Sequence, residues 1–244
     1  MAERSKSPFP RSYSNGIAIC IPAYNEESTI EQVVLDADRA LKQASIPGEI
    51  LVIDDCSTDR TWQILCEVKE NLPNLRVRRH SANQGIAVTF AELYQWATKE
   101  LVFLNSADGQ WKMSALLELL PLVDSYDIII AQRRDKHYGF SRQVGSWLFN
   151  ILPVIFFATR TYDAGSVKLV RRAVYDLPIT SSGVFAEAER IIRATRQGFR
   201  LGVKEIESFP RRAGTASGAK LSLVIESMLD LLKCWVDIVI LRRN

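Results

Sequence analysis

Short apolar runs alternate with longer segments of helical periodicity through the first 132 residues. The apolar runs predict five strands, at Ile17–Ile21, Ile50–Ile53, Leu75–Arg79, Leu101–Leu104 and Ile128–Ala131. The periodic segments predict helices near Glu27–Gln43, Thr61–Asn71, Gly85–Thr98 and Ser114–Val123. This alternation favours an α/β fold, with a mainly parallel sheet and helices on both of its faces.

The regular alternation of predicted strands and helices ends after about residue 132. A strand at Ser166–Val170, a helix near Val184–Arg196 and a strand near Leu201–Ile206 are predicted there. Residues 210–220, rich in Arg, Gly, Ser and Ala, predict a mobile loop. Residues 1–15 have no apolar core, so they predict a flexible tail and not a signal peptide. We expect one domain over residues 16–218 and an amphipathic helix in residues 219–244.

Polar residues before the first helix predict how that helix begins. Asn25 is placed to cap it, and Ser28 with Glu31 has the spacing of a capping box.

The final helix, predicted at about Ala219–Leu241, combines one polar stripe with an otherwise apolar surface. The stripe holds residues three or four apart, namely Ser222, Glu226, Asp230, Lys233 and Asp237. Such a helix needs apolar cover from the domain, from a bilayer interface or from a partner's helices. Leu148–Phe157 is similarly apolar, and neither segment reaches the ~20 residues that span a bilayer.

Composition narrows the classes of function. The 244 residues carry a formal net charge of +3, which lacks the strong basic bias of a nucleic-acid binder and is compatible with an anionic lipid surface. The four cysteines are scattered, with no metal-ligand spacing. Zinc is therefore not expected, and a reduced cytosolic compartment fits best.

Three strand ends carry the polar residues that point to chemistry. They are IPAYNE (Ile21–Glu26), IDDCSTD (Ile53–Asp59) and NSADGQ (Asn105–Gln110). Taken singly, the first could be a strand end with a helix cap and the second an Asx-rich turn. Taken together, they predict acidic loops at one sheet edge that gather around a cation-bridged diphosphate, because crowded carboxylates need such partners.

The order of these segments, with NQG (Asn83–Gly85) between the last two, resembles the family-two glycosyltransferases of the GT-A fold. Four further segments resemble the dolichyl- or polyprenyl-phosphate sugar synthases, the group of the dolichol-phosphate mannosyltransferases. They are DIIIAQR (Asp127–Arg133), the Arg142/Ser146/Asn150 spacing, DAGSVKLVRR (Asp163–Arg172) and VFAEAERIIRA (Val184–Ala194). The resemblance covers roughly residues 16–220.

The resemblance implies a nucleotide site formed by the first two loops, with contacts from Pro22, Ala23, Tyr24, Glu26, Asp54 and Asp55. This assignment is chemically reasonable. Asp55 can accept the imide N–H of uracil or guanine, and Tyr24 can pack on the base or ribose.

The resemblance also implies a site for Mg²⁺ or Mn²⁺ at an Asp-x-Asp motif followed by x-Gln. Asp108 and Gln110 match its second Asp and its Gln. Ser106 replaces its first Asp and is expected to contact the nucleotide. One carboxylate fewer is expected to weaken the metal site. The run after NQG also departs from the family, which commonly has a glycine-rich, basic sequence where this chain has Ile86-Ala87-Val88.

Positive charge is expected to hold the phosphates. By resemblance, Arg133, Arg142 and Ser146 grip the acceptor phosphate, while Arg211 and Lys220 contribute to catalysis by holding phosphate groups. A lone Arg in a sequence is more often a solvated surface residue. An insertion, Ser217-Gly218-Ala219-Lys220, separates the Ser-Lys pair of the family, so the match at Lys220 is weaker.

The implied reaction moves a sugar from a GDP- or UDP-sugar to a polyprenyl or dolichyl phosphate with inversion. The acceptor phosphate is already an anion and needs no general base, so Glu187 and Glu189 are expected to orient the sugar or an Arg. The alternative is that they are two charged residues on the surface of a helix, without a role in the site. The implied location is cytoplasmic, at the periphery of a membrane, with a membrane surface or a membrane-embedded protein as partner.

Two other functions remain open at this point. A transferase that acts on a glycan hydroxyl would need Glu187 or Glu189 as its base. A non-catalytic nucleotide-sugar-binding subunit of a membrane complex would explain the loss of a carboxylate at Ser106.

Overall fold

The computed structural model describes residues 15–133, 150–209 and 221–242. A seven-stranded sheet has the order β3-β2-β1-β4-β6-β5-β7. Its strands are β1 (Ile17–Ala23), β2 (Gly48–Asp54), β3 (Leu75–Arg79), β4 (Leu101–Leu104), β5 (Ile128–Arg133), β6 (Lys168–Arg171) and β7 (Leu201–Ile206). Only β6 runs antiparallel to its neighbours, β4 and β5, within this sheet. The predicted α/β class and mainly parallel sheet are confirmed.

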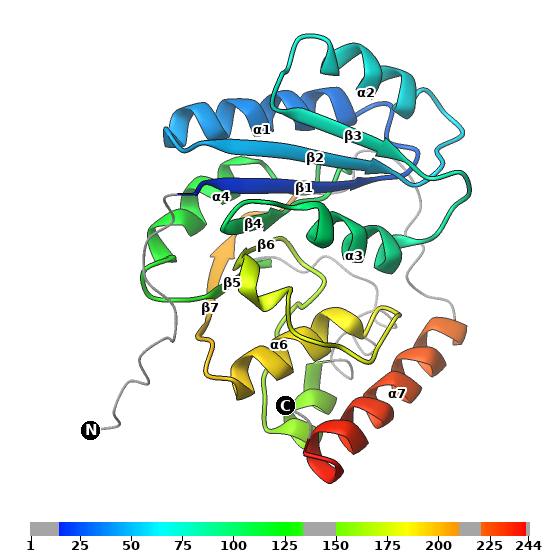
Figure 1. Ribbon diagram of the computed structural model, residues 1–244, viewed down its shortest axis with the longest axis vertical. Helices are drawn as coiled ribbons and strands as arrows, with labels where there is room; N and C mark the ends of the chain where they lie inside the picture. The colour runs from blue at the N-terminus through cyan, green and yellow to red at the C-terminus, as the bar shows by residue number, and fades with distance from the viewer. Residues whose placement is uncertain (1–14, 134–149, 210–220, 243–244) are drawn as a thin grey trace.

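Helices cover both faces of the sheet (Figure 1). One face packs against α1 (Ile30–Ala44), α2 (Thr61–Lys69) and α4 (Ser114–Leu119), which a short turn, η1 (Leu120–Leu122), follows. The other face packs against α3 (Ile86–Trp96) and α6 (Ala186–Arg196), with η2 (Arg172–Val174) between β6 and α6. Side chains of the central strands are almost wholly buried, because both faces are covered.

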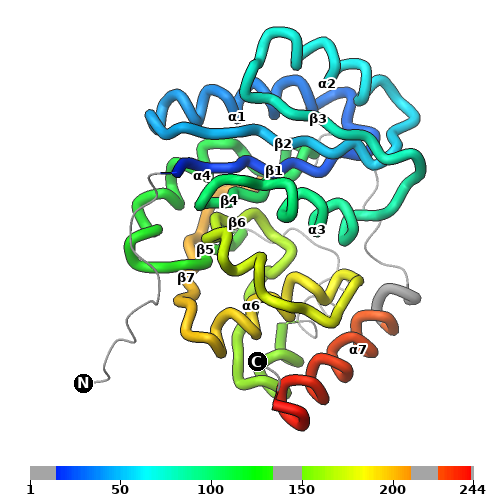
Figure 2. Tube along the Cα trace, viewed as in Figure 1, coloured from blue at the N-terminus to red at the C-terminus, as the bar shows by residue number. Residues whose placement is uncertain are grey.

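The last helix, α7 (Leu221–Trp235), continues into a π-helical turn, η3 (Val236–Ile240). It lies along α6, away from β1, β2 and β3 (Figures 1 and 2). Leu231, Cys234 and Ile238 share an apolar cluster with α6 and with Phe157. In the part of the chain that the structure describes, no helix combines the length and apolarity needed to cross a bilayer.

The predicted start of the first helix is wrong. Thr29 is the N-cap residue of α1, and no side chain caps the helix, so neither Asn25 nor a Ser28–Glu31 box performs this role. Asn25 instead adopts a positive φ of 55° and accepts a hydrogen bond from the backbone N–H of Thr58. A long-range contact has therefore taken the side chain that the local pattern assigned to the helix.

Candidate functional site

Three polar turns meet at one edge of the sheet. β1 lies between β2 and β4 and runs parallel to both, with Ala23 opposite Asp54 and Cys20 opposite Leu104. The carboxyl ends of the three strands therefore share the edge at which open parallel sheets bind ligands. This confirms the predicted convergence. We call residues 21–26, 53–59 and 105–110 together the strand-end rim.

The first two turns of the rim are joined by hydrogen bonds between side chains and backbone. Asn25 Oδ1 accepts from the Thr58 N–H at 2.8 Å, and the Asn25 N–H donates to Ser57 Oγ at 2.9 Å. The Glu27 N–H donates to Asp59 Oδ2 at 3.1 Å. These polar side chains thus hold the two turns in a fixed relation, in addition to any contact with a ligand.

Asp54 serves as an anchor inside the rim. Its carboxylate is fully buried and accepts hydrogen bonds from both the N–H and the hydroxyl of Ser57. Arg79 Nε lies 3.0 Å from the other carboxylate oxygen. Arg79, at the end of β3, was not among the site residues expected from the sequence. Because the guanidinium neutralises the buried carboxylate, the pair ties β3 to the end of β2.

Asp55 holds the NQG turn that precedes α3. Its Oδ1 accepts from the Gln84 N–H at 2.7 Å and its Oδ2 from the Gly85 N–H at 2.8 Å. Gly85 has a φ of +84°, which a residue without a side chain adopts without strain. The predicted contact of Asp55 with a base imide N–H therefore competes with two backbone hydrogen bonds.

His80 connects this turn to α3 and was also missed by the sequence analysis. Its Nδ1 lies 2.7 Å from Asp55 Oδ1 and its Nε2 lies 3.3 Å from Glu92 Oε2. Both contacts are hydrogen bonds only when both ring nitrogens carry protons. Burial acts to lower the pKa of His80, but the hydrogen bonds to Asp55 and Glu92 outweigh it and raise the pKa above its ordinary value.

The IPAYNE turn offers one exposed aromatic ring to the rim. Pro22 and Ala23 are buried in β1, whereas Tyr24 is 47% exposed. The Glu26 carboxylate accepts from the Thr29 hydroxyl at 3.2 Å. Of the residues predicted to hold the nucleotide, Tyr24 is therefore the one whose side chain is most open to a base or ribose.

The third turn brings together the predicted metal residues and Arg133. Ser106 Oγ donates to Asp108 Oδ1 at 2.6 Å, and the Gln110 N–H donates to the same oxygen at 3.0 Å. β5 extends two residues beyond its predicted end and so positions Arg133 to donate to Gln110 Oε1 at 3.3 Å. Its guanidinium also lies 5.7 Å from the centre of the Trp111 ring. An oxygen-rich turn and a cation thus share this end of the rim.

Glu187 lies in a buried polar cluster formed by α6, β6 and α3. Its carboxylate forms an ion pair with Lys168 and accepts from the Tyr94 hydroxyl at 3.1 Å. Lys168 is the first residue of β6 and lies opposite Leu104, the last residue of β4. Burial, and then the Glu187 carboxylate, raises the pKa of Tyr94 well above its ordinary value. Lys168 was not among the site residues expected from the sequence, although it belongs to the DAGSVKLVRR segment.

Glu189 faces the opposite way, toward α7. It is fully buried, and its carboxylate accepts from Thr180, from Ser181 and from Arg193 Nε at 2.7 Å. Burial acts to raise the pKa of Glu189, but the hydrogen bonds from Ser181, Thr180 and Arg193 outweigh it and hold the pKa below its ordinary value. Neither Glu187 nor Glu189 is an exposed pair on a helix surface.

Four predicted phosphate contacts, Arg142, Ser146, Arg211 and Lys220, lie outside the described residues. So do residues 1–14 of the predicted tail, the 210–220 loop and the boundary at residue 218.

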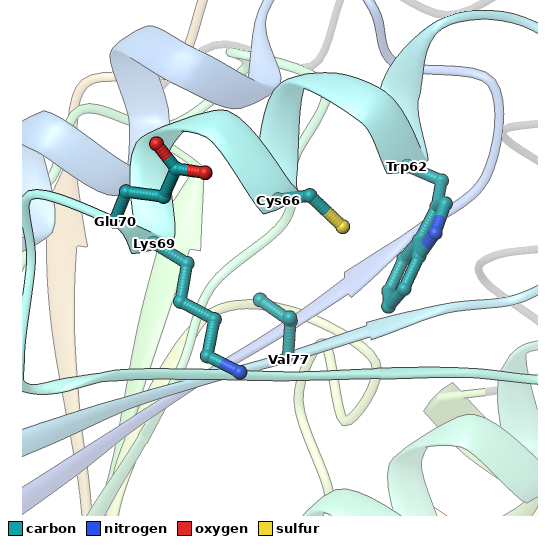
Figure 3. A pocket seen from close by; sticks show the side chains of 5 residues that line it. All are labelled: Trp62, Cys66, Lys69, Glu70 and Val77. Atoms are coloured by element: carbon teal, nitrogen blue, oxygen red, sulfur yellow. The ribbon is translucent and has the colours of Figure 1, made fainter.

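A separate groove lies between α2 and β3, lined by Trp62, Cys66, Lys69, Glu70 and Val77 (Figure 3). None of the residues predicted for the site lines this groove, so the strand-end rim remains the candidate site.

Comparison with known proteins agrees with this architecture. The mainly parallel α/β sheet, with the rim at its carboxyl edge, has the GT-A fold of its solved structural neighbours. Residues 18–175 match the model of glycosyl transferase family 2, and the chain belongs to that family. The resemblance predicted from the sequence is confirmed.

Two curated relatives act on lipid phosphates by name. The dolichol-phosphate mannosyltransferase of Pyrococcus furiosus is 28% identical over 180 residues, which cover 72% of this chain and 47% of that protein. The undecaprenyl-phosphate mannosyltransferase of Micrococcus luteus is 26% identical over 208 residues, which cover 80% of this chain and 84% of that protein. The chain thus spans about half the length of some relatives and most of the length of others.

Solved structures share the fold at lower identity. Mannosyl-3-phosphoglycerate synthase from Rubrobacter xylanophilus aligns with 93% of this chain and 74% of its own, with a TM-score of 0.69 at 14% identity. Glucosyl-3-phosphoglycerate synthase from Mycobacterium tuberculosis, in a complex with Mn²⁺, UDP and phosphoglyceric acid, aligns with 91% and 78%, with a TM-score of 0.67 at 16% identity.

Proposed function

We propose that the chain transfers a sugar from a GDP- or UDP-sugar to a polyprenyl or dolichyl phosphate, with inversion at the anomeric carbon. The observation that carries this proposal is the convergence of the strand ends that hold Tyr24 and Asp108, with Arg133 hydrogen-bonded to Gln110, in a chain of glycosyl transferase family 2. The choice of acceptor is supported by relatives whose names specify dolichol phosphate or undecaprenyl phosphate.

The donor would lie across the rim, with its base near Tyr24 and its diphosphate near Asp108 and Gln110. Pro22, Ala23, Glu26, Asp54 and Asp55 would contribute mainly by fixing the two turns that form its floor. Arg133 would balance the negative charge of a phosphate, since a guanidinium can make two parallel hydrogen bonds to phosphate oxygens. Ser106 would act on the donor indirectly, by orienting the Asp108 carboxylate with its hydroxyl.

The residues at Asp108 fit a divalent cation that binds together with the nucleotide. They offer the hard oxygen donors that Mg²⁺ and Mn²⁺ prefer, but within the described residues no group of three or more His, Cys, Asp or Glu could hold an ion alone. Asp108 and Gln110 would hold the ion, and the diphosphate would supply further ligands. Such an ion, when bound, would stabilise the negative charge of the departing nucleoside diphosphate.

A phosphate acceptor suits the positions of Glu187 and Glu189. A hydroxyl acceptor needs a group that removes its proton, whereas a phosphate oxygen is already charged near neutral pH. Glu187 is paired with Lys168 and Glu189 with Arg193, so each carboxylate already serves a buried cation. We therefore propose that both position the surrounding structure and that neither acts as a base.

The proposal is tested by assaying the purified chain with a panel of GDP- and UDP-sugars and a short-chain polyprenyl phosphate in detergent. We expect one donor to yield a glycosyl phospholipid, in a reaction that chelation of divalent cations suppresses. Glu187→Gln should retain transfer to the phosphate acceptor within roughly tenfold. If the wild type transfers sugar to a glycan hydroxyl and Glu187→Gln abolishes this transfer, the hydroxyl is favoured as the acceptor.

A second candidate function rests on Ser106. The hydroxyl stands where the family has a carboxylate, so the chain could bind nucleotide sugars without turning them over. Comparing wild type with Ser106→Asp in a metal-dependent donor-hydrolysis assay separates the two cases. Activity in the wild type supports an enzyme, whereas activity only in the variant supports a non-catalytic nucleotide-sugar-binding subunit of a membrane complex.

A further inference from the structure

The outer face of α7 is apolar, although α7 packs on the protein through its other side. Exposed side chains recur at three- and four-residue spacings, at Ile225, Met228, Leu229, Leu232, Val236, Val239 and Ile240, each between 36% and 57% exposed. The inner face has its own apolar residues, Leu231, Cys234 and Ile238, which are buried against α6. An ordinary surface helix shows water a polar face, so this arrangement is reversed.

Residues 150–157 lie beside α7 and show further apolar side chains. The ring of Phe156 meets that of Trp235 edge-on, with 6.2 Å between their centres, so this segment lies beside α7. Ile155, at 68% exposed, and Val154, at 38%, show apolar side chains in the same part of the molecule. We call the seven exposed side chains of α7 and η3, together with Val154 and Ile155, the outer apolar face.

The acidic side chains of α7 turn away from this face. Asp237 Oδ2 accepts from Arg193 Nη2 at 2.6 Å, and Asp230 Oδ2 accepts from the Gly183 N–H at 3.4 Å. A side-chain carbon added at Gly183 would lie 3.1 Å from Glu226 Oε1, so this carboxylate also leans toward the loop before α6. Asp230 and Asp237 therefore face the body of the protein, whereas Glu226 is exposed and leans toward that loop.

The basic side chains keep to the outside. The Lys233 side chain is 69% exposed, and its Nζ lies 3.7 Å from Asp230 Oδ1. Arg242 is exposed at the end of the helical segment. With Asp230 and Asp237 turned inward and Lys233 and Arg242 outward, the helix presents an apolar surface bordered by positive charge. That combination is complementary to an anionic bilayer, in which the bases meet headgroups and the aliphatic chains enter the acyl boundary.

The make-up of the face favours lipid over a protein partner. Its exposed members are aliphatic side chains and one Met, without the Trp, Tyr or Arg that anchor most protein interfaces. Trp235 lies half-buried at its border, a depth suited to the headgroup level of a membrane. A helix with four charged residues between Glu226 and Asp237 would lie in the membrane plane and not across it.

We propose that the outer apolar face docks the protein onto an anionic lipid bilayer, with α7 lying in the plane of the surface. The inward acids and Arg193 set the rotation of the helix that keeps the apolar residues outside. This inference rests on the proposed function only in its purpose, since a surface-bound enzyme would meet the phosphate of a membrane lipid.

Sedimentation with vesicles tests the docking directly. We expect the full chain to pellet with vesicles of phosphatidylcholine and phosphatidylglycerol and to bind pure phosphatidylcholine more weakly. Leu229→Glu should lower partitioning roughly tenfold or more, because it places a charge in the apolar face. The matched control is Leu35→Glu, on α1 and 37% exposed, which should bind like wild type. Thermal unfolding of both variants verifies that they fold.

A second pair of variants tests the charge complementarity. Lys233→Gln and Arg242→Gln should each reduce binding to anionic vesicles by about fivefold and leave binding to neutral vesicles almost unchanged. Failure of the wild type to bind either kind of vesicle overturns the proposal. A wild-type dimer that Leu229→Glu dissociates, with vesicle binding unaltered, also overturns it and identifies a second copy as the occupant.

Activity assays separate this inference from the proposed reaction. Leu229→Glu should transfer sugar normally to a short-chain acceptor in solution and poorly to a long-chain acceptor embedded in vesicles. If the wild type binds anionic vesicles and transfers sugar to neither acceptor, the docking surface is supported and the proposed reaction is wrong. Equal loss on both acceptors would contradict docking as the role of this face.

Discussion

At the strand-end rim, Asp55 and Asp59 accept hydrogen bonds from backbone N–H groups of neighbouring turns, whereas on α6 Glu187 and Glu189 each meet a buried cation. Asp55 and Asp59 therefore shape loops, and the α6 acids connect packed elements. This difference predicts which property of the protein changes when a charge is removed at each place. A change at the rim should alter ligand binding, and a change in the α6 pairs should alter the stability of the fold.

The largest expected effect is on stability, for Arg193→Met. This substitution leaves Glu189 and Asp237 without their shared cation in a buried interface, which costs about 3–5 kcal/mol of unfolding free energy. Urea unfolding measures the loss. Arg196→Met, exposed on the same helix, is the matched control and should change the free energy by about 0.5 kcal/mol or less. A loss below about 1 kcal/mol would mean that the α6 pairs do not stabilise the fold.

At the rim the corresponding change is Asp108→Asn. The substitution removes the negative charge that would hold a divalent cation, so transfer should fall roughly 100-fold or more. The midpoint of thermal unfolding should move little, because Ser106 and Gln110 can still donate to the remaining carbonyl oxygen. Steady-state kinetics and calorimetry on the same preparation measure both. A large loss of stability with unchanged kcat/KM would show that Asp108 stabilises the fold, as the α6 pairs are expected to do, and does not act on the ligand.

The sequence predicted the elements better than it predicted the partners. Alternating apolar runs were enough for the sheet and for the convergence of three strand ends, since parallel strands bring their carboxyl ends together. The partner of Asn25 was missed because Thr58 is 33 residues away. His80 stands alone in sequence, and its link to Asp55 appears only once β2 and β3 are paired.

The side of α7 that packs on the protein could not be predicted from the sequence pattern, for another reason. Both sides of the helix carry apolar residues, so periodicity shows a polar stripe without showing which side is buried. The partner that decides is Arg193, 44 residues from Asp237. This buried cation on α6 holds Asp237 inward, and the spacing of residues within α7 does not reveal it.

A pH dependence is expected at His80, whose two ring nitrogens each contact a carboxylate. Its pKa is raised in the folded state, so the stabilisation is complete below the ordinary histidine pKa of about 6.5 and is lost as pH rises through the folded value. Thermal midpoints of wild type should therefore fall over that window relative to His80→Asn. Parallel profiles for the two proteins would show that His80 is not protonated between Asp55 and Glu92.

The smallest expected effect is a change in unfolding free energy that compares a strained backbone position at the rim with an unstrained position in a helix. Cys56, between Asp55 and Ser57, has a φ of 62°, a left-handed conformation that costs a residue with a side chain about 1 kcal/mol. Cys56→Gly should relieve this strain and stabilise the protein by about 0.5 kcal/mol, after the greater freedom of glycine in the unfolded chain is subtracted. Cys66→Gly, at an exposed position within α2, is the same substitution without the strain and should destabilise by about 0.5–1 kcal/mol. Opposite signs in urea unfolding would show that the rim turn stores strain. A loss of stability in both variants would mean that the turn tolerates its conformation without cost, and that the hydrogen bonds of Asp55 and Ser57 fully determine it.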